Sequence, residues 1–281
     1  MNVWYQIVSI LPFEWAQPGR MMFMKNALLA IILLAPVFAL LGTMIVNNRM
    51  AFFSDALGHG AFTGLVIGGI LGFITPMWAA VLFSIVFSTL VTIIRFRSGM
   101  SPDTIIGVFS STAVALGLFL ATGGSGQAVR LSTFLVGDIL SIGKNDIVLL
   151  LGVLIIVLVL WALYFNRLLL ISISASLARS RGFRVFRDEL LFTILVAVIV
   201  TVSMPWIGLL VINSFLVLPA AASRNVSSGS RQYTAFAVGV SLLSGIIGLF
   251  VSYSLNTATG ATIVLVMALF FFVSMGVGRK G

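Results

Sequence analysis

Residues 146–165 read DIVLLLGVLIIVLVLWALYF, a run in which every residue after the first aspartate is apolar or glycine. An α-helix needs about 20 such residues to cross the hydrocarbon core of a bilayer. The stretch therefore predicts a membrane-spanning helix, because a helix satisfies its own backbone hydrogen bonds where water is absent. Eight further apolar stretches recur along the chain, at 23–46, 51–73, 77–95, 103–121, 188–204, 206–222, 233–252 and 259–277.

The composition of the 281-residue chain agrees with this prediction. The chain is 60% hydrophobic and only 8% charged, whereas about 25% of the residues of soluble domains are charged. A water-soluble enzyme is therefore excluded, and the length leaves no room for a substantial soluble domain. We expect an all-α polytopic membrane protein with eight to nine transmembrane helices, plus a short re-entrant or interfacial helix at 131–142 on the extracytoplasmic side.

The N-terminal residues 1–22 are expected to form an interfacial segment, with Trp4, Tyr5 and Trp15 at the depth of the lipid headgroups. Residues 23–281 then form a single transmembrane domain. With the N-terminus outside, twelve of the 16 Lys and Arg residues fall on the cytoplasmic side and four on the other. This distribution predicts a cytoplasmic C-terminus. The net charge of +9 therefore indicates topology, and no nucleic-acid partner is expected.

The longest hydrophilic interruption, residues 166–187, is cytoplasmic in this topology. Its central part, from Ser174 to Gly182, has a capping serine, good helix formers and a terminal glycine. It predicts a short basic helix at the membrane surface. Docking of a cytoplasmic partner and anchoring to anionic lipid are equally compatible with its charge.

The chain has seven acidic residues and one histidine, so each can be considered by itself. Ionisable groups inside a bilayer are costly and need a reason. Four acids lie where helices are expected to begin, where they complement the helix dipole, and a fifth lies at the interface: Asp103, Asp146, Asp188, Glu189 and Glu14. Asp55 and Asp138 have no such explanation.

Asp55 precedes the single histidine, His59, by four residues inside the apolar stretch 51–73, so both side chains project from one helix face. A carboxylate with an imidazole suits Mn, Fe or Zn better than soft Cu(I). Further ligands would come from facing helices or a second subunit. The structural alternative is that Asp55 caps a helix that begins later and His59 hydrogen-bonds to its neighbour. The depth of His59 in the span favours the functional interpretation.

Three other polar residues are candidates for lining a pathway. Asn213 and Ser214 lie in the middle of an apolar stretch ahead of a proline, and Asp138 lies on the short extracytoplasmic segment. Hydrogen bonds between helices, or a helix cap for Asp138, are the structural alternatives. Small residues also recur every four positions on the Asp55 helix and predict close helix packing: Gly60, Gly64, Gly68 and Gly72.

The sequence lacks the motifs of a catalytic subunit. A P-loop requires G-x-x-x-x-G-K-[ST], but the nearest string, from Gly137 to Lys144, has the wrong spacing and is followed by Asn145. There is no cysteine, and one histidine cannot supply both a site ligand and a catalytic base. We therefore expect no enzyme activity, no permanently bound cofactor and no ATP hydrolysis by this chain.

Five segments of the sequence resemble motifs of a known family. The segment RMAFFSDALGHG (49–60) is similar to the second-helix signature of the ABC-3 family, the manganese, zinc and iron permeases of bacterial ABC importers. Four further motifs match in the same order: SPDTIIG (101–107), FLVGDIL (134–140), LVLPAAA (216–222) and TGATIVL (259–265). The similarity covers about residues 20–280.

The resemblance implies a type II ABC importer permease in the bacterial cytoplasmic (inner) membrane. Two such subunits, expected as a homodimer, would be driven by ATPase subunits and supplied by an extracytoplasmic metal-binding protein. Asp55 and His59 become candidate metal-coordinating residues for Mn, Zn or Fe. The segment 172–184 becomes the coupling helix that docks on the ATPase, with Ala178, Arg179, Arg181 and Gly182 as its contact residues.

Two positions depart from the family pattern. Ser174 and Ser176 stand where coupling segments often carry an acid, and Gly260-Ala261 stands where the last loop often reads Gly-Pro. Two other functions remain open on the sequence. One is a gradient-driven transporter with Asp55 and His59 as a proton relay, and the other is a membrane scaffold that recruits a cytoplasmic protein through its basic loop.

Overall fold

The computed structural model describes residues 2–9, 17, 21–72, 76–123 and 137–277. Within these ranges the chain is helical and contains no strand. The helices are α1 (Asn2–Val8), α2 (Met22–Asn47), α3 (Phe53–Leu71), α4 (Pro76–Arg97), α5 (Pro102–Gly123), the 3-10 turn η3 (Ile139–Ser141), α7 (Lys144–Ile173), α8 (Ala175–Ser180), α9 (Val185–Ile207), α10 (Leu209–Val226), α11 (Ser230–Leu255) and α12 (Thr259–Val277).

Eight of the described helices are long and apolar enough to cross a membrane, namely α2, α4, α5, α7, α9, α10, α11 and α12. α3 has 19 residues, the same length as α12, but its composition is less apolar because it carries Asp55, His59 and several glycines. The prediction of an all-α polytopic protein with eight to nine spans is confirmed. The helix that carries the candidate site is therefore the one in which polar residues replace apolar ones.

Two helix boundaries differ from the sequence prediction. The stretch 146–165 is the middle of α7, which begins at Lys144 and runs on to Ile173. Asp146 closes its first turn by accepting a hydrogen bond from the Gly143 amide at 2.9 Å. The helix continues past Arg167, whose guanidinium packs over the rings of Tyr164 and Phe183, 5.5 Å from each ring centre, and ends after a second short apolar run.

The break between the sixth and seventh predicted spans lies later than expected. α9 continues through Pro205, and the chain turns at Gly208, whose φ of 82° and ψ of 151° are accessible only to glycine. Proline removes only its own donor, so a helix can run for a few residues beyond it. The break is therefore made by the glycine.

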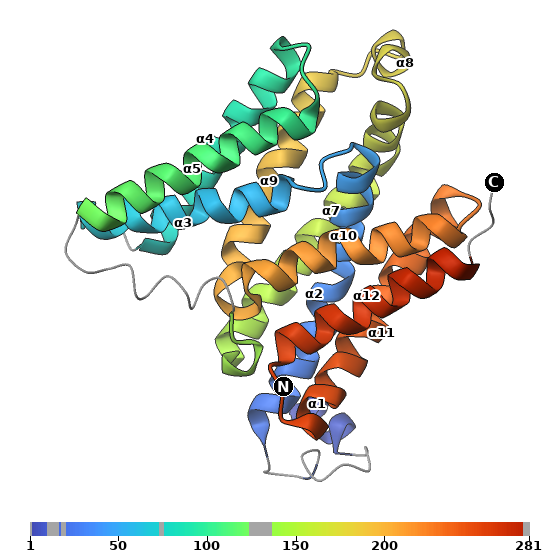
Figure 1. Cartoon of the computed structure of the whole chain (residues 1–281). Coiled ribbons are helices and arrows are strands. Elements are labelled where there is room, and N and C mark those ends of the chain that lie inside the picture. Colours follow the sequence, from blue (N-terminus) through green and yellow to red (C-terminus); the bar gives the residue numbers. More distant parts are fainter. Residues whose placement is uncertain (1, 10–16, 18–20, 73–75, 124–136, 278–281) are drawn as a thin grey trace.

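The long helices form two groups that lie side by side in Figure 1. α3 packs against α4 and α5, and α4 packs against α9; these four helices are called the α3 group below. α10, α11 and α12 pack against one another, and α2 joins them through α10 and α11; these four are called the α10 group. α7 packs mainly on α2.

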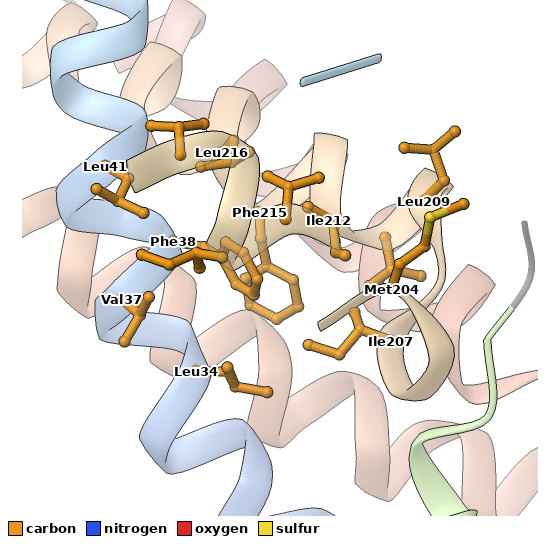
Figure 2. Packing of buried hydrophobic residues seen from close by; sticks show 14 of the residues in the cluster. Leu34, Val37, Phe38, Leu41, Met204, Ile207, Leu209, Ile212, Phe215 and Leu216 are labelled. Atoms are coloured by element: carbon orange, nitrogen blue, oxygen red, sulfur yellow. The ribbon is translucent and has the colours of Figure 1, made fainter. Parts of the chain in front are cut away.

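Apolar side chains hold the α10 group together. Figure 2 shows Leu34, Phe38 and Leu41 of α2 facing Phe215 and Leu216 of α10. The rings of Phe38 and Phe215 lie 6.2 Å apart between centroids, and both side chains are buried. α2 is the most buried of the spanning helices, so it forms the centre of the bundle and not a lipid-facing edge.

The N-terminal segment packs on the N-terminal end of α2. Trp4 Nε1 donates to the Lys25 carbonyl at 3.1 Å, and the Tyr5 hydroxyl donates to Asn26 Oδ1 at 2.9 Å. Asn26 Nδ2 in turn donates to the carbonyl of Ile142 at 3.1 Å, which ties the segment after η3 to the same end. Trp15, the third predicted interfacial aromatic residue, lies outside the described residues.

Candidate functional site

The site begins at the first turn of α3. Ser54, Ala56 and Leu57 are buried there, whereas the Asp55 and His59 side chains are 46% and 32% exposed. His59 Nε2 lies 3.5 Å from Asp55 Oδ2, one helical turn away. The two groups predicted to share a helix face therefore do so, and the imidazole nitrogen lies beside the carboxylate oxygen.

A third polar group reaches this pair from the other helix group. Asn213 of α10 donates from Nδ2 to Asp55 Oδ1 at 2.9 Å. Its amide oxygen, Oδ1, is buried and has no hydrogen-bond partner within the described residues. Buried polar atoms are normally paired, and a carboxamide oxygen is a suitable ligand for a hard or borderline divalent cation. Asn213 thus orients the carboxylate and supplies a further oxygen beside it.

A cavity of about 810 Å³ opens beside these residues. Its wall includes Asp55, one member of the Asp55 and His59 pair. It also includes the three residues predicted to line a pathway, Asp138, Asn213 and Ser214. Residues 257–261, which lead into α12 and form its first residues, are part of the wall and include the Gly260-Ala261 pair. His59 does not contribute to the wall. The cavity lies where the α3 group meets the α10 group.

Asp138 and Ser214 are engaged in local hydrogen bonds within this wall. Asp138 caps η3 by accepting from the Leu140 amide at 3.0 Å. The Ser214 hydroxyl donates to the Leu210 carbonyl of its own helix at 2.9 Å. Both residues line the cavity. The cap made by Asp138 is the structural alternative that the sequence left open for it, whereas the Ser214 hydroxyl bonds within its own helix and not between helices.

The turn that carries Asp138 lies directly on the break between α9 and α10. Gly137 has a φ of 65°, and a Cβ there would collide with the backbone of Ile207 and Gly208. The Asp138 amide donates to the Pro205 carbonyl at 3.4 Å. Residues 131–136, the first half of the predicted re-entrant helix, lie outside the described residues. The half that is described contains only the 3-10 turn η3.

The pair is incomplete as a metal site by itself. Among the described residues, no group of three or more His, Cys, Asp or Glu side chains could hold a metal ion. A site built on Asp55 and His59 would therefore be completed by the Asn213 amide, by water or by another chain. Such a partial site suits a cargo ion that must be released again.

The predicted glycine ridge of α3 faces α4 over most of its length. A Cβ at Gly64 would lie 2.7 Å from the Ala80 Cα, and one at Gly68 would lie 2.6 Å from the Ala79 Cβ. Gly60 faces Phe87 at 3.3 Å. Gly72 differs from the prediction: it follows the helix as its C-cap, with a φ of 62° and open space around it. The ridge therefore ends at Gly68.

The predicted coupling helix is shorter than expected, because α7 extends to Ile173 and α8 covers only Ala175–Ser180. Ser174 caps α8 by accepting from the Leu177 amide at 3.3 Å. Arg179 and Arg181 are exposed, and Gly182 follows the helix with a φ of 80°. Ala178 is buried against this chain's own residues, so it anchors α8 and is not available to a docked partner.

One interaction could not be predicted from local sequence patterns. Glu189, whose place at the start of α9 already complements the helix dipole, also accepts at Oε1 from the Arg95 guanidinium at 3.0 Å. The two residues are 94 positions apart, so no local pattern could have joined them. Asp188 has no partner for either carboxylate oxygen within the described residues, although it is only 2% exposed.

The fold defines a multi-pass helical membrane protein with a cavity between its two helix groups. Comparison with known proteins supplies the family. The profile described as the ABC 3 transport family matches residues 20–278, and the chain belongs to this family. The prediction of this family from the Asp55 and His59 segment is confirmed, as is the prediction of a permease subunit that leaves ATP hydrolysis to a separate chain.

Two relatives and one solved structure illustrate the similarity. The manganese import system permease protein ScaB of Streptococcus parasanguinis is 33% identical over 258 residues, covering 92% of this chain and 91% of its own. The high-affinity zinc uptake system membrane protein ZnuB of Haemophilus influenzae is 30% identical over 250 residues, covering 89% and 95%. The structure of PsaBC from Streptococcus pneumoniae in complex with Fab superposes with a TM-score of 0.78 at 28% identity, covering 100% of this chain and 97% of that one.

Proposed function

We propose that this chain is the permease subunit of an ATP-driven importer for divalent transition-metal ions, with manganese, zinc and iron as candidate cargo. The observation that carries the proposal is the convergence of Asp55, His59 and Asn213 beside one cavity. Carboxylate, imidazole and carboxamide donors together suit a borderline divalent cation. The names of the relatives ScaB and ZnuB support manganese and zinc.

The transport step follows from the position of these donors. Asp55 and His59 belong to α3, whereas Asn213 belongs to α10, so the site lies across the contact between the two helix groups. A cation is held while both groups are together. When the groups separate, the Asn213 side chain leaves the carboxylate and the remaining two ligands hold the ion more weakly. This is alternating access with release by loss of a ligand.

The partners follow from the same proposal. ATPase subunits dock at the cytoplasmic face on α8, where Arg179 and Arg181 are exposed. An extracytoplasmic binding protein delivers the ion at the opposite end. A second copy of the permease completes a homodimer, and its surface covers the half-exposed Asp55 and His59 side chains. The chain lies in the bacterial inner membrane with its C-terminus in the cytoplasm.

Uptake of radioactive manganese and zinc by cells that produce the permease with its ATPase and binding protein tests the proposal. Replacing Asp55 or His59 by alanine should abolish uptake while the complex still assembles. Ser214→Ala is the matched control, because its hydroxyl lines the same cavity but bonds within its own helix. Normal uptake in both variants would refute the assignment.

The same assay separates the other two functions. Uptake that continues with an inactive ATPase and stops when the proton gradient is collapsed would identify a gradient-driven transporter. Tolerance of change at Asp55 and His59, with sensitivity at Arg179 and Arg181, would identify a scaffold. Either result would replace the importer proposal.

A further inference from the structure

We propose that the ion pair between Arg95 and Glu189 is the mechanical link that transmits movement of α8 to the metal-binding helix α3. The two residues would act as positioning residues for transport. The inference rests on the proposed function, because it assumes that an ATPase moves α8. It adds a route by which that movement reaches Asp55 and His59, which lie on α3, whereas α8 packs mainly on α7 and α9.

The first step of the route joins α8 to the beginning of α9. Ala178 of α8 is buried in one apolar cluster with Ile171 of α7 and Val185 of α9. The connection between α8 and α9 is short, and its backbone is hydrogen-bonded. The Phe183 amide donates to the Ala178 carbonyl at 3.1 Å, and the Val185 amide donates to the Phe183 carbonyl at 3.1 Å. A push on α8 therefore moves the first turn of α9 with it.

The second step joins α9 to α4. The Arg95 guanidinium donates to Glu189 Oε1 at 3.0 Å, with side-chain exposures of 14% and 10%. Beside this ion pair, the rings of Phe96 and Phe186 meet edge to face, with 5.1 Å between centroids. One turn deeper, the hydroxyls of Thr92 and Thr193 lie 2.9 Å apart. The cytoplasmic ends of these two helices are thus joined by polar and aromatic contacts.

A further hydroxyl pair continues this contact towards the outer side. Thr201 of α9 donates to Ser84 of α4 at 2.9 Å, and both side chains are buried. Hydrogen bonds between spanning helices fix their register more closely than apolar packing does, because lipid competes well for apolar surface but not for hydroxyls. α4 and α9 are therefore held together along most of their length.

The third step leads from α4 to α3. The Arg95 guanidinium also contacts the sulfur of Met50, which is buried in the turn before α3. The carbonyl of Met50 accepts from the amide of Phe53, the first residue of α3, at 2.9 Å. Arg95 thus touches both the start of α9 and the turn that leads to Asp55. The close packing of Gly64 on Ala80 ties the two helices farther along.

Joining two helices by a buried ion pair costs free energy of desolvation. Two buried charges lose hydration, and well-packed apolar residues would be at least as stabilising. What the pair adds is a fixed geometry between two specific side chains. The carboxylate of Glu189 on α9 is thereby held to one specific basic partner on α4.

The test compares Glu189→Gln with Asp188→Asn in the purified complex of permease and ATPase in liposomes, with the extracytoplasmic binding protein supplying the metal. Both variants replace a buried acid at the start of α9, but only Glu189 is paired. The measured quantity is the number of metal ions transported per ATP hydrolysed. E189Q should lower this ratio on the order of tenfold, with metal binding in the absence of ATP unchanged. D188N should leave both quantities unchanged.

The charge-swapped variant R95E/E189R should recover part of the lost ratio, because it restores an ion pair in the same place. A wild-type ratio in E189Q, or an equal loss in D188N, would overturn the inference. Absence of metal transport by the unmodified complex would instead refute the proposed function, so the two failures are distinguishable.

A cross-link tests the route without removing the pair. The chain has no cysteine, so T92C/T193C introduces the only two thiols, at positions whose hydroxyls lie 2.9 Å apart. If α4 and α9 move as one body, oxidation to the disulfide should leave transport within about twofold of the reduced sample. Loss of transport on oxidation, with recovery on reduction, would overturn the inference.

Discussion

Replacing Asn213 by alanine is the most informative single change outside the Asp55 and His59 pair. The substitution removes the amide that donates to Asp55 Oδ1 at 2.9 Å and also removes the unpartnered Oδ1 atom beside it. A hydrogen bond to a charged acceptor contributes about 1.5–3 kcal/mol, and each 1.4 kcal/mol is about a tenfold change in affinity. We therefore expect metal binding to weaken about 10- to 100-fold in N213A.

The affinity for Mn²⁺ and Zn²⁺ can be measured by calorimetric titration of the permease complex in detergent. Ser214→Ala is the control, since the two residues are neighbours on α10 and line the same cavity. Its hydroxyl bonds to the carbonyl of Leu210, so S214A should bind as the unmodified protein does. Unchanged affinity in N213A, or an equal loss in both variants, would refute the role given to Asn213.

Two further predictions concern packing and docking. G64A should destabilise the permease by about 1–3 kcal/mol, because the new Cβ would lie 2.7 Å from Ala80 Cα; thermal unfolding in detergent should show a lower midpoint than G152A, whose Cβ meets open space. R179E/R181E should reduce co-purification of the ATPase with the permease at unchanged expression, whereas R179K/R181K should retain it. Equal midpoints in the first comparison, or equal ATPase recovery in the second, would contradict these predictions.

Much of the fold was predictable because the bilayer makes local composition decisive. Every predicted span corresponds to a helix, since an apolar run of this length has no other way to satisfy its backbone in lipid. The boundaries were less predictable because they depend on contacts from elsewhere in the chain. Arg167, inside α7, packs on Phe183 from the segment after α8, and α9 runs through Pro205 to end at Gly208, beyond the predicted end at residue 204.

The candidate site was predictable only in part. Asp55 and His59 are four residues apart on one helix, so the sequence periodicity alone places them together. Asn213 was a candidate because it is polar in an apolar span, but its contact with Asp55 joins positions 158 residues apart. No local pattern encodes such a pairing. The bond between Arg95 and Glu189 could not be predicted for the same reason, because each residue by itself is explained by its position near a helix end.

The importer proposal and the route through Arg95 make different demands on the molecule. The first requires that Asp55 and His59 bind the cargo, and the second requires that α3, α4 and α9 move together. Variants at the pair should change how tightly the ion is held, whereas variants at Glu189 should change how much transport each ATP drives. Measuring binding and transport on the same preparations separates the two.

The most direct test of the central claim is ATP-dependent metal uptake into liposomes that contain the permease, its ATPase and the binding protein. The unmodified complex should accumulate Mn²⁺ or Zn²⁺ only when ATP is hydrolysed. D55N and H59Q should reduce uptake to the background, while the complex assembles and hydrolyses ATP. Uptake at the unmodified rate in both variants would contradict the claim that this pair carries the metal.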